Sequence, residues 1–157
     1  MPKITNCLWF DSQAAEAAEF YVGIFPNSRI GKIARYPEGL PGDRAGQVLT
    51  VEFELDGTPF LGLNGGPVFT FDEAISFVID CEDQAEVDRY WNALLAGGGS
   101  ESQCGWLKDR FGVSWQVVPR RLTELMSGPS ETANKVAAAM MQMVKLDVAK
   151  LEAAAAA

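Results

Sequence analysis

Residues 4–25 of the chain read ITNCLWFDSQAAEAAEFYVGIF. The first seven of these residues are mostly apolar and form a run of strand length, which predicts a strand at residues 4–10. Asp11 and Ser12 can cap a following helix, because their side-chain oxygens can accept hydrogen bonds from its first amides. Apolar residues then recur at helical spacing up to Phe25, and Pro26 ends the pattern. The stretch therefore predicts a strand that runs directly into a helix.

Three strand candidates follow this helix, at residues 29–36, 48–55 and 59–64. Residues 48–55 alternate apolar and polar side chains, as a half-buried strand does. Asp56-Gly57 between the second and third candidates is a hairpin signal. Gly65-Gly66-Pro67 then breaks the chain, so residues 1–67 form one strand–helix–three-strand module.

The same order recurs in the second half of the chain. Residues 74–80 predict a strand, and Asp83 with Glu86 resembles a capping box before an apolar helical stripe. Three short strand candidates follow at residues 101–104, 106–110 and 113–118. A shift of 70 residues places Phe20-Tyr21 on Tyr90-Trp91. This recurrence predicts a duplicated βαβββ module of α+β class, with the second copy at residues 68–119.

The pattern changes after Pro119. A short helix is expected at residues 120–126, which completes a domain at residues 1–126, and a C-terminal helix is expected within residues 127–157. Ser130 can cap this longer helix, whose apolar face would hold Val136, Met140, Val144, Val148 and Leu151. Such a face packs either on the chain's own core or on a second subunit.

Composition argues against two classes of partner. Acidic residues outnumber basic ones 21 to 13 in the 157-residue chain, which gives a net charge of −8 and argues against nucleic acid and anionic membranes. The three cysteines form no CxxC pair, so they predict reduced thiols rather than a zinc knuckle. The chain shows neither a signal peptide nor an apolar run of membrane-spanning length. These features predict a cytoplasmic protein.

Four segments together resemble the PhnB-like family of the vicinal oxygen chelate superfamily, which includes glyoxalase I, bleomycin-resistance proteins and dioxygenases. They are LWFDSQAAEAAEFYVGIFPNSRI (residues 8–30), LNGGPVFTFDEAISFVIDCEDQAEVDRYW (63–91), CGWLKDRFGVSWQVVP (104–119) and KLDVAKLEAA (145–154). The resemblance implies paired βαβββ modules that curve into a cup-like mixed sheet, usually in a homodimer. A homodimer is also expected because each module leaves a sheet edge to be paired or covered.

The family also carries the label 3-demethylubiquinone-9 3-methyltransferase. Methyltransferases of the nucleotide-binding type hold their cofactor with a glycine-rich turn after the first strand. Here that strand runs into Phe10-Asp11-Ser12, with no glycine motif. The sequence therefore argues against methyl transfer.

The resemblance places the superfamily's metal ligands, usually His and Glu, at Asn6, Asn64, Ser76 and Gln116. The chain contains no histidine, and neutral amide oxygens bind zinc-like metals poorly. We therefore expect no metal and no cofactor. By strand alternation, the rows of Asn6 and Ser76 should line the cup as a pocket for a weakly polar small molecule. Alternatively, these polar groups only hydrogen-bond to one another in a filled core.

Three further side chains are candidates for chemistry. Cys104 is a candidate nucleophile that has no histidine to activate it, so a structural role is the alternative. Asp80 is a candidate base, and Trp106 can offer a stacking surface to a ligand. Two function classes remain open. The first is a metal-independent small-molecule-binding protein, and the second is an enzyme with lyase, isomerase or dioxygenase-like chemistry on a small organic substrate.

Overall fold

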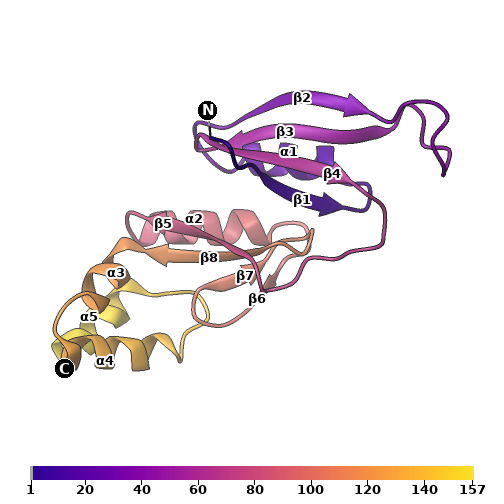
Figure 1. The fold of residues 1–157 in the computed structure, drawn as a ribbon. Helices are drawn as coiled ribbons and strands as arrows, with labels where there is room; N and C mark the ends of the chain where they lie inside the picture. Colours follow the sequence, from indigo (N-terminus) through magenta and orange to yellow (C-terminus); the bar gives the residue numbers. More distant parts are fainter. Residues whose placement is uncertain (1) are drawn as a thin grey trace. The chain divides into compact units, whose positions relative to one another are not determined.

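The computed structural model describes residues 2–157. The chain divides into two compact units, with the boundary between Phe71 and Asp72. Each unit contains one four-stranded mixed sheet and one helix between its first two strands (Figure 1). The prediction of an α+β protein with two βαβββ modules is confirmed. None of the described helices has the length and apolar character needed to cross a membrane.

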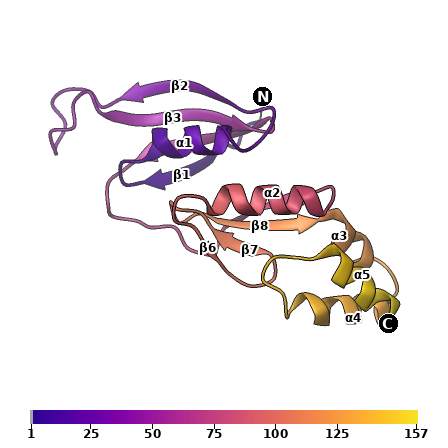
Figure 2. The ribbon, with the colours of Figure 1, turned by 180° about the vertical axis from the view of Figure 1, so that it is seen from behind.

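The first unit holds β1 (Asn6–Phe10), α1 (Ala14–Val22), β2 (Arg29–Arg35), β3 (Val48–Leu55) and β4 (Thr58–Asn64). The strand order is β1-β4-β3-β2, with β1 parallel to β4 and the other pairs antiparallel. In Figure 2, α1 lies in front of these strands. Helix and sheet approach closely at Gly62, where an added Cβ would lie 3.1 Å from the Cβ of Ala14. The face under α1 carries the buried apolar residues of β1, β3 and β4, which are Leu8, Phe10, Val51, Phe53, Leu55 and Phe60.

The predicted hairpin at Asp56-Gly57 is confirmed. Both residues have positive φ angles, 48° and 77°, as a two-residue type I′ turn requires. The predicted capping of α1 by Asp11 or Ser12 is wrong. The residue before the helix is Gln13, and the Ala14 amide donates instead to the side chain of Asn64, at 2.9 Å. A residue distant in sequence therefore provides the cap.

The second unit repeats the arrangement with β5 (Ser76–Cys81), α2 (Gln84–Leu95), β6 (Ser100–Glu101), β7 (Trp106–Lys108) and β8 (Ser114–Pro119). Its strand order is β5-β8-β7-β6, with β5 parallel to β8. The carboxylate of Asp83 accepts the Glu86 amide at 2.9 Å, as the capping pattern predicts. Buried side chains of α2 and of the sheet form the core of this unit, among them Val87, Tyr90, Leu94, Leu107, Trp115 and Val117.

The C-terminal segment corrects the prediction of one long helix. It contains α3 (Arg120–Met126), α4 (Ser130–Met140) and α5 (Val148–Ala156), and Ser130 makes no side-chain cap. Residues 141–147 leave the helical path because the carbonyls of Met143 and Val144 accept the amides of Cys104 and Gly105 at 2.8 Å. These contacts from another part of the unit explain why the apolar spacing did not produce a continuous helix.

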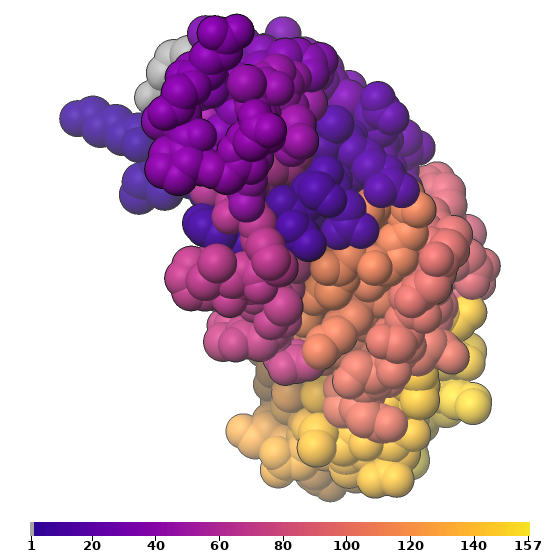
Figure 3. All heavy atoms as spheres, turned by 90° about the vertical axis from the view of Figure 1, so that its right-hand side faces the viewer, coloured from indigo at the N-terminus to yellow at the C-terminus, as the bar shows by residue number. Residues whose placement is uncertain are grey.

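The apolar residues of this segment pack on their own chain. Their core consists of Leu122, Leu125, Val136, Leu146 and Leu151. Figure 3 shows the yellow C-terminal helices against the salmon and orange atoms of the same unit. Of the two alternatives for this face, the structure supports burial within the chain.

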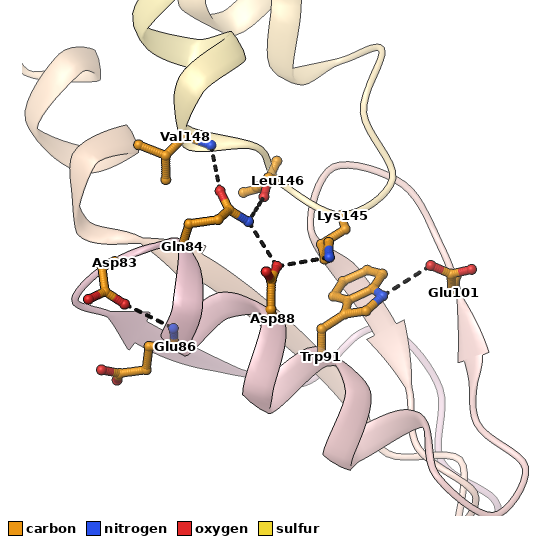
Figure 4. A network of polar contacts seen from close by, with 9 residues as sticks. All are labelled: Asp83, Gln84, Glu86, Asp88, Trp91, Glu101, Lys145, Leu146 and Val148. Atoms are coloured by element: carbon orange, nitrogen blue, oxygen red, sulfur yellow. Dashed lines mark hydrogen bonds and ion pairs between the residues drawn. The ribbon is translucent and has the colours of Figure 1, made fainter.

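One side chain joins the C-terminal segment to α2. The amide group of Gln84 donates to the Leu146 carbonyl at 3.1 Å, and its oxygen accepts the Val148 amide at 2.7 Å (Figure 4). Lys145 forms an ion pair with Asp88 at 2.8 Å beside it. Gln84 thereby satisfies the start of α5 as well as the connecting loop, which fixes this segment on the second unit.

Candidate functional site

The candidate site lies on the far face of the second sheet, which we define as the face opposite α2. Residues paired across a ladder point to the same side of a sheet. The registers of β5, β7 and β8 therefore put one row of side chains on this face, which comprises Ser76, Val78, Trp106, Lys108, Ser114 and Gln116. The expectation that the Ser76 row lies opposite the helix is correct for this unit.

A hydrogen bond joins two of the predicted site residues. The Gln116 side-chain amide donates to the Ser76 hydroxyl oxygen at 2.9 Å. Both side chains are half-buried, and within residues 2–157 neither makes a further side-chain hydrogen bond. The Gln116 carbonyl oxygen and the Ser76 hydroxyl proton are therefore still able to bind a ligand.

Apolar surface surrounds this pair. Trp106 is the direct ladder partner of Gln116 on β7 and is half-buried. Val78 is its partner on β5 and is 62% exposed, which is unusual for a valine in a strand. A flat molecule placed here would contact an indole ring and a valine while it reached both polar groups.

The opposite end of the row holds an ion pair and a buried hydroxyl. Lys108 forms an ion pair with Glu73, and the hydrogen bond between them holds the pKa of the Glu73 carboxyl below its ordinary value. Ser114 is the ladder partner of Lys108 and is only 1% exposed. Its hydroxyl oxygen has no hydrogen-bond partner within residues 2–157.

Asn6 lies on the α1 side of the first sheet, whereas strand alternation predicted that its row would face away from the helix. Asn64 lies on the same side, where it lines a separate hollow of about 370 Å³ with Tyr36 and Arg44. Asn6 shares its side of β1 with the buried Leu8 and Phe10, and its amide donates to the Pro59 carbonyl at 3.2 Å. Asn64 is 7% exposed; it accepts the Ala14 amide and donates to the Val48 carbonyl at 3.1 Å. Both asparagines lie on the α1 side of the first sheet.

A difference in loop length explains this error. Asp11 to Gln13 separate β1 from α1, whereas only Glu82 and Asp83 separate β5 from α2. A shift of 70 residues aligns α1 with α2 but leaves β1 one residue out of register with β5. An error of one residue in a strand assigns every side chain to the wrong face of the sheet. Counting back from the equivalent strand ends, Phe10 and Cys81, makes Thr5 the counterpart of Ser76 and Leu61 the counterpart of Gln116.

The far face of the first sheet, opposite α1, therefore carries a different set of side chains. A hollow of about 430 Å³ lies there, with Thr5, Glu52 and Leu61 in its lining. Toward the other end of β1, the Trp9 indole donates to the Gly66 carbonyl at 2.9 Å and packs edge-on against Phe69. The first module thus keeps a hydroxyl where the second has Ser76, but it has no amide to match Gln116.

The family model described as 3-demethylubiquinone-9 3-methyltransferase matches residues 2–118. The chain belongs to this family. A solved structure titled a putative 3-demethylubiquinone-9 3-methyltransferase, PhnB protein, from Bacillus cereus is 34% identical, with a TM-score of 0.67 over 75% of this chain and 99% of that chain. The PhnB-like assignment is therefore confirmed.

Two further structures share less with this family member. Protein PA1353 from Pseudomonas aeruginosa is 20% identical, with a TM-score of 0.62 over 76% of this chain and 98% of that one, and it supports the fold alone. A glyoxylase/bleomycin resistance protein/dioxygenase domain from Frankia sp. is 12% identical, with a TM-score of 0.46 over 76% of this chain and 92% of that one. Among curated proteins, none matches the chain.

The residues of this PhnB-like chain do not fit the metal that the resemblance to the vicinal oxygen chelate superfamily implies. Asn6 and Asn64 face α1. On the far face of the first sheet, the residues equivalent to Ser76 and Gln116 are Thr5 and Leu61, and a leucine cannot bind a metal. Ser76 and Gln116 supply only neutral oxygens, and the chain has no histidine. Within residues 2–157, no three cysteine, aspartate or glutamate side chains gather as a metal site would require.

The remaining chemical candidates are held in structural contacts. Cys104 has a positive φ of 59° in a turn, and its Sγ lies 3.9 Å from the Met141 sulfur. Asp80 forms an ion pair with Arg120 at 3.0 Å. Burial raises the pKa of the Cys81 thiol to about 12, so this cysteine stays protonated. None of these contacts assembles a nucleophile with a base.

The structure thus brings together Ser76, Trp106 and Gln116. Asn6 and Asn64 belong to the first unit, on the α1 side of its sheet, and Cys104 lies in the turn before β7. Sequence reasoning missed Lys108, Ser114 and Glu73 as neighbours of the site. Ser114 precedes Gln116 by two residues and therefore shares its row, which alternation alone could have indicated. The pairing of Glu73 with Lys108 links two segments distant in sequence and left no such signal.

Proposed function

We propose that the chain binds a small organic molecule on the far face of the second sheet and needs no metal to do so. The observation that carries the proposal is the Ser76–Gln116 hydrogen bond, whose two members keep unused hydrogen-bonding capacity beside Trp106 and Val78. Ligand sites in proteins combine apolar walls with a few such polar groups. Membership in the PhnB-like family supports a ligand-binding fold, and a cytoplasmic location fits the composition.

Binding rather than catalysis is the function that this arrangement favours. The polar groups at Ser76 and Gln116 are neutral, and neither can act as a general base near neutral pH. Two carboxylates on either side of Ser76 in the chain, Asp80 on β5 and Glu73 before it, are each paired with a cation. Such a site can orient a ligand, as a sequestering protein does.

Replacing Gln116 with leucine is expected to abolish or strongly weaken ligand binding and to leave the fold intact. Leucine keeps apolar volume but removes the amide, and the single lost hydrogen bond costs only about 1 kcal/mol of stability. The measurement is a screen of small metabolites for ligand-induced shifts in melting temperature, with the wild-type protein and the variant in parallel.

Gln142→Leu is the matched control, because Gln142 is exposed and lies in the connection between α4 and α5. It should respond to ligands as the wild type does. A large drop in melting temperature for Gln116→Leu with unchanged ligand affinity would contradict the proposal. That result would mean that Gln116 only stabilises the core.

We also propose that the protein is a homodimer. β1 and β5 are edge strands of their sheets, and an unpaired edge exposes backbone donors and acceptors that favour association. A two-fold dimer is the commonest closed assembly. The C-terminal helices do not support this proposal, because their apolar face is already buried within one chain.

Size-exclusion chromatography with light scattering is expected to give about twice the 17.0 kDa mass of the chain. Measurement at tens of micromolar protein is sufficient. A mass equal to that of one chain, unchanged across a dilution series, would refute the dimer.

A further inference from the structure

The Glu73–Lys108 ion pair lies at the end of the far face where β5 and β8 begin and β7 ends. Lys108 belongs to β7, Glu73 precedes β5, and β8 lies between these two strands. On β8, Ser114 pairs with Lys108 of β7 on one side and with Ser76 of β5 on the other. The ion pair therefore links the two strands that flank β8, at the end where β8 begins with Ser114, whose buried hydroxyl has no partner within residues 2–157.

A buried hydroxyl without a partner is uncommon in folded proteins and calls for an explanation. A hydroxyl beside an ammonium group is suited to bind an anion, since both donate hydrogen bonds. The anion now beside Lys108 is the carboxylate of Glu73, which leaves Ser114 unbound. A ligand carboxylate that entered between Lys108 and Ser114 could accept hydrogen bonds from both.

Glu73 is suited to give way to such a ligand. It lies before the first residue of β5, outside the hydrogen-bonded ladder, so its side chain can move without disturbing the sheet. Its side chain is 61% exposed, compared with 37% for Lys108, so the displaced carboxylate would be solvated at little cost. Lys108 is held within β7 and would stay in place.

We infer that the ligand of the far face is a small carboxylic acid, whose carboxylate replaces Glu73 beside Lys108 and Ser114. This inference rests on the proposed function and specifies its substrate class. The apolar part of the acid would extend along the row toward Val78, Trp106 and Gln116. A phosphate group fits less well, because its greater charge would meet one lysine on a chain of net charge −8.

Benzoate and its neutral isostere benzamide provide the test, measured by titration calorimetry on the full-length protein. Benzoate should bind the wild type more tightly than benzamide does. Lys108→Met should lower the affinity for benzoate at least about tenfold, and Ser114→Ala should lower it roughly fivefold. Glu73→Gln should strengthen benzoate several-fold, because the internal competitor loses its charge. The affinity for benzamide should be the same in the Lys108 and Glu73 variants as in the wild type.

Asp72→Asn is the matched control, since it removes a neighbouring negative charge that forms no ion pair with Lys108. It should change benzoate affinity by less than about twofold. Melting temperatures of all variants confirm that each is folded. Loss of benzoate affinity in Glu73→Gln, or equal binding of benzoate and benzamide, would overturn the inference.

The two proposals fail in distinguishable ways. If ligands from the metabolite screen bind with dependence on Gln116 but without regard to Lys108 or to ligand charge, the carboxylate inference is wrong and the proposed function stands. If neither benzoate nor any screened metabolite binds, both are wrong.

Discussion

Replacing Asn64 with leucine is expected to lower the free energy of unfolding by about 2–5 kcal/mol. The side chain is buried, and it accepts the Ala14 amide at the start of α1 while it donates to the Val48 carbonyl at the start of β3. Leucine has a similar size but leaves the buried Ala14 amide and the half-buried Val48 carbonyl without this partner. Urea unfolding followed by circular dichroism measures the loss.

Asn92→Leu serves as the control, because Asn92 is exposed on α2 and should change stability by no more than about 0.5 kcal/mol. If Asn64→Leu were as stable as this control, the capping role would be refuted. Asn64 would then again be a candidate ligand-binding residue.

Replacing Leu151 with alanine is expected to cost about 2–5 kcal/mol. Leu151 is fully buried in the core that α3, α4 and α5 share with Leu146, and truncation leaves a cavity there. Met141→Ala, at a position that is 60% exposed, should cost far less. Thermal and urea unfolding of the two variants give the comparison.

The concentration dependence of this effect separates burial within the chain from docking on a second subunit. Because Leu151 is buried by its own chain, the destabilisation should be the same at every protein concentration. A loss that grows on dilution, together with a shift toward monomer, would show that α5 packs on a partner instead.

Local signals in the sequence predicted most of the fold. The apolar run at residues 4–10 and the helical spacing after it fixed the order of β1 and α1. Asp56-Gly57 has the residue types that a type I′ turn needs, and Asp83 with Glu86 supplies a local cap. Each of these signals acts between residues close in sequence, so it can be recognised without knowledge of the tertiary structure.

The errors arose where distant residues decide the outcome. The side on which Asn6 lies depends on one additional residue between β1 and α1, which the comparison of the two modules by a single shift overlooked. The apolar spacing of Val144 and Val148 fits a helix, but hydrogen bonds from Cys104 and Gly105 hold the intervening backbone in a loop. The cap at Asn64 and the Glu73–Lys108 pair depend on tertiary contacts in the same way.

Metal dependence of binding tests the central claim most directly, because Ser76 and Gln116 are proposed to bind their ligand without a divalent ion. The measurement is elemental analysis of the dialysed protein, combined with titration of a ligand from the screen before and after treatment with EDTA. We predict no stoichiometric zinc, nickel, manganese or iron, and the same affinity in both titrations. About one equivalent of metal that survives dialysis, is lost in Gln116→Leu and is required for binding would contradict the claim.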